Sequence, residues 1–232
     1  PFADFTAGKD FHLAPKINCW YYSITKAKMC QDRKTLLHGE KRVGTGEGKR
    51  RLGMKLFSSA EIRRLEELAG EEGVSLESLM EQAGTAVAVE AEKLLHPLEG
   101  KRVAILCGKG NNGGDGLVVA RNFMEVGIET VLVLVEGEPT TREAIENYRL
   151  LDDSVKIFDR TCPFSLGKGD VIVDAVFGTG FHGEQDEFAA EVVDKINAAD
   201  AFTVSLDVPS GLCGNMRDGD PLPPSVSADL TI

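Results

Sequence analysis

Short apolar runs alternate with helix-forming segments from residue 102 onward, and this alternation constrains the fold more than any other feature of the chain. The apolar runs lie at 102–107, 130–135, 155–158, 171–174 and 202–206. Segments with helical spacing or helix-start signals separate several of them, at about 117–124, 140–151 and 187–198. This order predicts an α/β fold in which helices cover both faces of a mostly parallel central sheet.

Two further helices are expected before the first strand. Ser58 and Glu61 form an S-x-x-E capping box, which predicts a helix start. A second helix is expected over about 75–95, ending before Pro97. Its small residues, Gly84 among them, permit close packing against a neighbouring element. Thr140 and Glu143 form another capping box and predict the start of the helix at 140–151.

The first 53 residues differ from the rest of the chain in charge. They hold 11 of the 26 Lys and Arg residues but only 5 of the 37 Asp and Glu residues. They show no sustained hydrophobic period, and 44–53 is rich in Gly, Lys and Arg. We therefore expect 1–53 to be a basic, disordered extension or an upstream mis-start, with a targeting arm as the alternative. The folded domain is expected at 54–232.

Charge and composition exclude several classes of function. The domain at 54–232 is acidic, which argues against a nucleic-acid surface. No apolar run approaches the length of a membrane span, and no secretory signal is recognisable. The five cysteines are irregularly spaced without a CxxC pair, so neither a disulfide framework nor a zinc site is expected. These features predict a cytoplasmic protein with no membrane or nucleic-acid partner.

A glycine-rich segment follows the strand expected at 102–107. Gly108, Gly110 and Gly113 spell G-x-G-x-x-G between a strand and a helix, the context of a dinucleotide-binding fingerprint. Glycines let the backbone approach a phosphate, and the helix amino terminus supplies N–H groups. Glu136, twenty residues after Gly116, is a candidate for the acid that binds a ribose hydroxyl.

Asn111, Asn112 and Asp115 make this segment unusually polar. A carboxylate about 5 Å from a phosphate charge costs roughly 3 kcal/mol at an effective dielectric constant near 20. A cation held by oxygen ligands would offset that repulsion. Alternatively, Asp115 caps the following helix and points away from the ligand. The sequence leaves both interpretations open.

Two other strands are expected to end in polar loops. Asp174 closes one apolar run and precedes a loop with glycines at 178, 180 and 183. Asp207 closes another and precedes the turn Pro209-Ser210-Gly211. Each loop alone is also compatible with an ordinary tight turn. Because ligands bind at the carboxyl ends of parallel strands, we expect the three loops to share one crevice.

From about Lys55 onward, the chain resembles the NAD(P)H-hydrate epimerase family, the amino-terminal half of many bifunctional repair enzymes. The resemblance rests on LMEQAG at 79–84, GNNGGDG at 110–116, DAVFGTG at 174–180 and LDVPSG at 206–211. It implies a Rossmann-like three-layer α/β/α fold and a hydrated NADH or NADPH substrate. It also implies one potassium ion per subunit, a homodimer, and a fused or partner ADP- or ATP-dependent dehydratase.

The resemblance assigns roles to residues of the three loops. It makes Asp174, Asp207 and, secondarily, His182 candidate catalytic residues. The implied potassium ligands are Asn112, Asp174 and Ser210. The implied substrate contacts are Asn111, Asn112, Gly113, Gly114, Asp115, Gly178, Thr179, Gly180, Phe181, His182, Gly183, Glu184 and Asp207.

The implied reaction inverts the carbon that carries a hydroxyl beside the ring nitrogen of the hydrated nicotinamide. Losing the hydroxyl gives an iminium-like species, and water returns on the other face. This chemistry needs an acid, a base and negative charge near the developing cation. Asp174 cannot easily serve both as a tight metal ligand and as a free base.

Three departures from the family pattern stand out. Lys109 occupies a position often held by Pro; its cation either helps to bind phosphate or is simply solvated. Gly214 and Asn215 replace a more acidic stretch. The chain stops at 228–232, inside an expected strand, so we expect a domain truncated at its carboxyl end.

Two other functions compete with the epimerase. A nicotinamide-dependent dehydrogenase is supported by the G-x-G-x-x-G pattern, but the length leaves no room for a separate substrate domain. A non-catalytic binding module would not require polar residues at the strand ends. Since Asn112, Asp115, Asp174, Asp207 and Ser210 are all present, this alternative is disfavoured.

Overall fold

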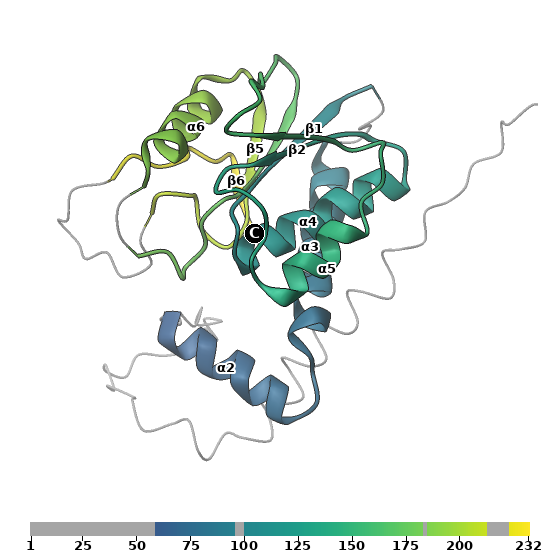
Figure 1. Ribbon diagram of the computed structural model, residues 1–232, viewed down its shortest axis with the longest axis vertical. Coiled ribbons are helices and arrows are strands. Elements are labelled where there is room, and N and C mark those ends of the chain that lie inside the picture. Colours follow the sequence, from purple (N-terminus) through teal and green to yellow (C-terminus); the bar gives the residue numbers. More distant parts are fainter. Residues whose placement is uncertain (1–58, 96–99, 183–184, 213–222) are drawn as a thin grey trace, which may run out of the picture. The chain divides into compact units, whose positions relative to one another are not determined.

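The computed structural model describes residues 59–95, 100–182, 185–212 and 223–232 (Figure 1). The chain divides between Lys55 and Leu56, and all described residues belong to the second unit. The expectations for residues 1–53, for Ser58 and for the stretch around Gly214 and Asn215 therefore concern parts of the chain outside the described residues.

A six-stranded sheet forms the centre of the domain, and every neighbouring pair of its strands is parallel. The strand order is β3-β2-β1-β4-β5-β6. The central strands are buried, which explains why their sequences are apolar without alternation. The bounds are β1 Arg102–Cys107, β2 Glu129–Leu134, β3 Lys156–Asp159, β4 Val171–Ala175, β5 Phe202–Ser205 and β6 Leu230–Thr231.

Helices cover both faces of this sheet (Figure 1). Alternate side chains of a strand point to opposite faces. Accordingly, Ile105 of β1 packs in a cluster with residues of α3, α4 and α5, whereas Leu106 packs in a second cluster with residues of α6. The predicted three-layer α/β/α fold is confirmed. The helices are α2 Ser59–Glu71, α3 Leu76–Leu95, α4 Asn111–Glu125, α5 Arg142–Arg149 and α6 Glu187–Ala198.

The helix after β1 starts earlier than the sequence suggested. It begins at Asn111, so the residues as far as Gly116 are helical and do not belong to the loop. Gly113 explains this tight geometry, because a Cβ atom there would lie 1.9 Å from the carbonyl oxygen of Gly108. Glycine inside a helix costs up to about 1 kcal/mol relative to alanine. Here it lets the first helical turn fold back against the end of β1.

The capping box predicted at Thr140 and Glu143 is wrong. The helix begins at Arg142 with Thr141 as its N-cap, and Thr141 makes no side-chain capping bond. Both the backbone N–H and the hydroxyl of Thr140 instead donate to the carbonyl oxygen of Lys109, over 2.8 and 3.1 Å. Thr140 therefore secures the glycine-rich loop.

The long helix α3 packs closely against the amino-terminal half of α4. A Cβ atom on Gly84 would lie 2.5 Å from Cβ of Val118 and 2.6 Å from the carbonyl oxygen of Asp115. Met80 lies directly over Gly114 in the same way. The small residues expected to allow close packing thus position the helix that follows the glycine-rich loop.

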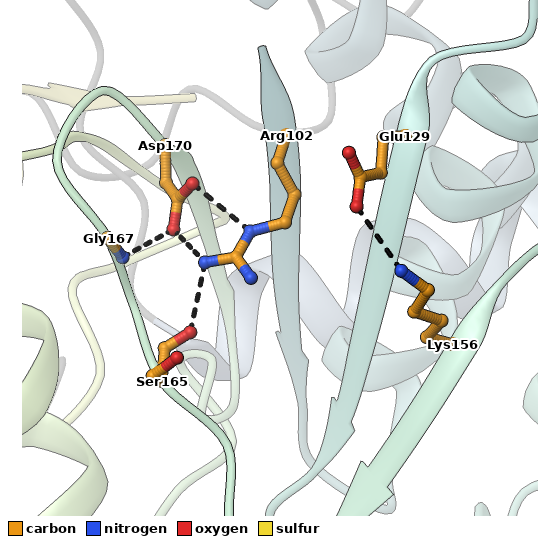
Figure 2. Close-up of polar contacts among 6 residues, drawn as sticks. All are labelled: Arg102, Glu129, Lys156, Ser165, Gly167 and Asp170. Carbon is orange, nitrogen blue, oxygen red and sulfur yellow. Dashed lines mark hydrogen bonds and ion pairs between the residues drawn. The ribbon is translucent and has the colours of Figure 1, made fainter.

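Ion pairs join the amino ends of neighbouring strands, at the edge of the sheet opposite to the glycine-rich loop. Arg102 donates from Nε to Asp170 over 3.1 Å and from its Nη2 to the other oxygen of that carboxylate (Figure 2). The same Nη2 donates to the carbonyl oxygen of Ser165 over 3.0 Å. An exposed pair, Glu129 and Lys156, links β2 to β3 over 3.4 Å.

In the described part of the chain, no helix combines the length and apolarity that a membrane crossing requires.

Candidate active site at the carboxyl ends of the strands

Three polar segments meet at the carboxyl edge of the sheet, where neighbouring strands end. Leu106 of β1 pairs with Asp174 of β4, which pairs with Ser205 of β5. The glycine-rich loop leaves β1 at Gly108, the second loop leaves β4 after Ala175, and the third leaves β5 after Ser205. The sequence prediction that these loops lie together is confirmed.

The glycine-rich loop presents the amino terminus of α4 to this edge. Gly110 is the N-cap and, having no side chain, makes no side-chain capping bond. The first turn contains no acidic residue. The opening N–H groups of a helix have no partner within it, and the helix dipole places positive potential there. This terminus is chemically suited to bind a phosphate group.

Asp115 does not cap this helix, so that interpretation of the sequence is wrong. It is the fifth residue of α4, beyond the N-cap Gly110. Burial raises the pKa of Asp115 to about 8, and the nearby carboxylates of Asp207 and Glu66 add to the rise. Asp115 therefore lies in a concentration of negative charge, an environment that favours a cation.

Asp174 is completely buried and lies at the centre of a hydrogen-bond network. It accepts bonds from the hydroxyl of Ser205 over 2.7 Å, from the backbone N–H of Ser210 over 2.9 Å, and from the hydroxyl of Ser210. Burial raises the pKa of Asp174, while the bonds from Ser210 and Ser205 oppose the rise. This carboxylate joins the ends of β4 and β5.

Ser210 connects the second loop to the third. Its side chain is fully buried, and its hydroxyl oxygen accepts a hydrogen bond from the backbone N–H of Phe177 over 2.8 Å. The same hydroxyl donates to Asp174. The turn at 209–211 thus holds the serine against the end of β4.

Asp207 differs from Asp174 in exposure and conformation. It is exposed, and its φ angle is 64°, the only positive value among the described non-glycine residues. Asp is one of the few residues that adopts this left-handed conformation at modest cost. Its Oδ2 accepts a hydrogen bond from the backbone N–H of Thr179 over 2.6 Å. No bond to its Oδ1 occurs among the described residues.

At Gly178 the second loop meets both the third loop and the start of α4. A Cβ atom there would lie 2.6 Å from Oδ2 of Asp207 and 3.2 Å from Cγ of Asn112. A glycine is therefore required at this position. Asn112 contributes a second unusual feature: both its side-chain oxygen and its nitrogen are buried, and neither has a hydrogen-bond partner within the described structure.

The unpartnered Asn112 amide permits a test of the potassium site implied by the resemblance. Leaving a buried polar group unpaired costs about 1–3 kcal/mol, so the amide oxygen is suited to receive a ligand. An amide oxygen, a carboxylate and a hydroxyl are hard oxygen donors, which fit alkali or alkaline-earth cations. Within the described residues, no cluster of three His, Cys, Asp or Glu side chains suits a metal ion. The residue types of Asn112, Asp174 and Ser210 therefore fit a hard cation, potassium included.

The remainder of the second loop is only partly described. Phe181 stacks on Phe177, with ring centroids 4.1 Å apart. Nε2 of His182 lies 3.5 Å from the guanidinium of Arg63 in α2. Gly183 and Glu184, both expected to contact substrate, lie outside the described residues.

Helix α2 contributes two residues that the sequence interpretation missed. Arg63 meets His182, and Glu66 lies within electrostatic range of Asp207 and Asp115. Burial raises the pKa of Glu66, and Asp207 adds to the rise. Arg63 and His182 are 119 residues apart in sequence, and the helical pattern around Arg63 resembles that of any amphipathic helix. No local signal could have identified these residues.

Glu136 and Lys109 form an ion pair at the carboxyl ends of β2 and β1. Lys109 Nζ lies 3.3 Å from Oε1 of Glu136, and the backbone N–H of Lys109 donates to Oε2 over 3.3 Å. The Glu136 carboxylate is close to Gly108, where a Cβ atom would lie 2.9 Å from Oε2. The Lys109 ammonium is thus ion-paired although its side chain is half-exposed, and its contribution to phosphate binding stays a prediction.

Fold and site together define a three-layer α/β/α domain that joins a helix amino terminus, an exposed carboxylate and a buried carboxylate at the carboxyl edge of a parallel sheet. The family model described as YjeF-related protein N-terminus matches residues 76–232, more than half of the chain. The chain belongs to this family, and the resemblance found from its motifs is confirmed.

Two named relatives illustrate the similarity. The bifunctional NAD(P)H-hydrate repair enzyme Nnr of Methanothermobacter thermautotrophicus is 39% identical over 171 residues, covering 69% of this chain and 32% of the relative. An NAD(P)H-hydrate epimerase of Phaeosphaeria nodorum is 32% identical over 157 residues, covering 67% of this chain and 64% of the relative. The chain thus spans about a third of the bifunctional relative.

A solved structure supports the same fold. The crystal structure of yeast ynu0, YNL200c, superposes with a TM-score of 0.63 at 27% sequence identity. The superposition covers 77% of this chain and 79% of the yeast chain. The Rossmann-like architecture is therefore shared with the yeast protein.

Proposed function

We propose that this chain is an NAD(P)H-hydrate epimerase, which interconverts the S and R forms of hydrated NADH and NADPH. Its family membership and the names of its relatives support the assignment. The structural observation that carries the proposal is the convergence at Gly178, where the Asp207 carboxylate and the unpartnered amide of Asn112 lie together. A domain selected only for stability has no need of either feature.

Asp207 is the proposed proton carrier. The Thr179 N–H orients Oδ2, and the loop holds the residue in a left-handed conformation that directs the carboxylate toward Gly178. A carboxylic acid here protonates the departing hydroxyl, which leaves as water. The carboxylate then takes one proton from the water that adds to the opposite face. One water leaves and one enters, so the reaction needs neither an oxidant nor a reductant.

Asp174 has a positioning role in this proposal. Its buried carboxylate already accepts hydrogen bonds from Ser205 and Ser210, so it is badly placed to exchange protons with a substrate. With Asn112 and Ser210 it would hold the potassium ion, one per subunit. A bound potassium ion would supply positive charge to offset the substrate pyrophosphate and the surrounding carboxylates.

His182 is the secondary candidate for proton transfer. It is exposed, and Arg63 lies beside its Nε2. The neighbouring loop residues Thr179, Gly180 and Phe181 would form one wall of the substrate site, and Asn111 to Asp115 would form the other. Gly183 and Glu184 complete the proposed contacts.

The decisive experiment is an epimerase assay on purified R-form hydrated NADPH. A dehydratase specific for the S form couples inversion to a loss of substrate, and potassium chloride is compared with tetramethylammonium chloride. We expect turnover that potassium stimulates. A folded protein that binds hydrated NADPH without inverting it would favour a binding module instead. Consumption of NADH with carbonyl substrates would favour a dehydrogenase.

The proposal extends to location and partners. A cytoplasmic protein suits the two described cysteines, Cys107 and Cys162, which are both free thiols. A homodimer and a dehydratase, fused or separate, are the proposed partners; the bifunctional names of several relatives support the second. Size-exclusion chromatography with light scattering tests the dimer.

A further inference from the structure

The strand order divides the carboxyl edge of the sheet into two halves. In the order β3-β2-β1-β4-β5-β6, the chain reverses direction along the sheet between β1 and β4. Dinucleotides bind across such a reversal, with one mononucleotide over each half. The proposed proton carrier Asp207 follows β5, and Gly178, which lies against its carboxylate, follows β4. The nicotinamide half of the substrate therefore belongs over β4 and β5, and the adenosine half over β1, β2 and β3.

Three charged side chains follow the strands of the adenosine half, Lys109 after β1, Glu136 after β2 and Arg160 after β3, and each of them lies in an ion pair. Lys109 pairs with Glu136 over 3.3 Å, and Arg160 pairs with Asp186 over 2.9 Å. The two pairs are close enough to interact: the N–H of Ala189 and the Arg160 guanidinium lower the pKa of Asp186, and Lys109 adds to this effect. None of these four charged groups serves the proposed inversion chemistry.

Glu136 is the member of this group that lies against the glycine-rich loop. Its Oε2 is bound by the backbone N–H of Lys109 and lies close to Gly108, so the carboxylate is fixed at the carboxyl end of β2. A carboxylate at this place in a dinucleotide fold accepts hydrogen bonds from the ribose hydroxyls and repels a 2′-phosphate. The Lys109 ammonium, which would attract a 2′-phosphate, is paired with the same carboxylate over 3.3 Å.

We propose that Glu136 and Lys109 read the 2′ position of the adenosine ribose and give this protein a preference for hydrated NADH over hydrated NADPH. This inference rests on the proposed epimerase function. The Glu136 carboxylate accepts hydrogen bonds from the ribose hydroxyls and holds the Lys109 ammonium in an ion pair. When Glu136 is replaced by an uncharged residue, the hydrogen bonds to the ribose hydroxyls weaken, and the Lys109 ammonium becomes available to a 2′-phosphate.

The test compares the two substrates in four forms of the 232-residue protein: wild type, Glu136→Gln, Glu136→Gln with Lys109→Met, and Glu129→Gln. Glu129 is a matched control, since it also pairs with a lysine, over 3.4 Å (Figure 2). It is the first residue of β2, whereas Glu136 follows the last. The readout is the ratio of kcat/KM for hydrated NADPH to that for hydrated NADH. Calorimetric binding of NADPH and NADH gives the corresponding affinity ratio without turnover.

We expect Glu136→Gln to raise both ratios at least tenfold, Glu129→Gln to leave them unchanged, and the added Lys109→Met to remove most of the gain. Ratios that move no more in Glu136→Gln than in Glu129→Gln would overturn the inference. Failure of the epimerase proposal is distinguishable: neither substrate would be inverted, while the affinity ratio would still respond to Glu136→Gln. Absence of turnover together with absence of binding by both dinucleotides would overturn both proposals.

Discussion

At the scale of single residues, the backbone of Asp207 permits a substitution that isolates its charge. Asn also adopts the left-handed conformation that Asp207 holds, and its oxygen can still accept the bond from Thr179. We therefore expect the free energy of unfolding of Asp207→Asn to stay within about 1 kcal/mol of the wild-type value. The epimerase rate should fall by roughly 10²- to 10⁴-fold, the usual contribution of a general acid or base. Thermal unfolding and the coupled assay measure the two quantities. A variant with full activity would remove Asp207 from the mechanism.

Asp115 should make the stability of the protein depend on pH. In the unfolded chain its pKa lies near 3.8, whereas in the folded protein burial raises it to about 8. Between these values the folded state holds a proton that the unfolded state has released, so raising the pH favours unfolding. The free energy of unfolding is therefore highest below about pH 4, and it falls as the pH rises through the folded-state pKa of about 8. From pH 5 to pH 9 the loss is on the order of 4 kcal/mol.

Urea unfolding of wild type and Asp115→Asn at pH 5, 7 and 9 measures this effect. The buffers should contain tetramethylammonium as their only cation, because a bound alkali ion would lower the pKa of Asp115. We expect the variant to become more stable than wild type as the pH rises. A stability difference that stays constant over the three pH values would show that Asp115 is ionised throughout.

At the scale of elements, the contact between α3 and α4 determines where the glycine-rich segment lies. A Cβ atom on Gly84 would press on Val118 and on the backbone of Asp115. We expect Gly84→Ala to destabilise the fold by about 1–3 kcal/mol, the usual cost of overpacking, and to lower epimerase activity by shifting the start of α4. Gly70 in α2 is the control, since a Cβ atom there meets nothing within 4 Å. Gly70→Ala should be neutral or slightly stabilising. Equal effects of the two changes would mean that helix propensity, and not packing, governs this contact.

The elements also show what a sequence can and cannot predict. Apolar runs in β1 and β4 are long enough to be recognised because both faces of these strands are buried. The start of α4 was misplaced because glycine usually ends a helix, whereas Gly113 is required here by the close approach of Gly108. Thr140 has the composition of a helix cap but uses its hydrogen bonds on Lys109. In each error a tertiary contact outweighed a local preference.

At the scale of the whole molecule, the motifs located the site better than they described its chemistry. The loops after β1, β4 and β5 were predicted to meet because parallel strands end at one edge, and they do. The burial of Asp174, the positive φ angle of Asp207 and the approach of Arg63 to His182 depend on contacts between distant residues. Spacing along the chain carries no information about such contacts.

A bound cation should stabilise the folded molecule as a whole. Ligand binding to the native state alone adds about 1.4 kcal/mol when the ligand is at ten times its Kd. For a domain of this size, that raises Tm by roughly 3–6 °C. We expect potassium chloride to raise Tm relative to tetramethylammonium chloride at equal ionic strength, and Asn112→Ala to abolish the difference. Equal Tm values in the two salts would contradict the proposed potassium site.

The central place of β1 in the sheet also has a consequence for the newly made chain. One neighbouring strand, β2, is the next strand along the chain, but the other, β4, begins only at Val171. At ribosomal rates of about 5–20 residues per second, the apolar strand at 102–107 waits roughly 3 to 13 s for its second partner. An unpaired apolar strand edge invites aggregation in that interval. A chaperone that covers this edge until translation reaches β4 is therefore expected to raise the yield of folded protein.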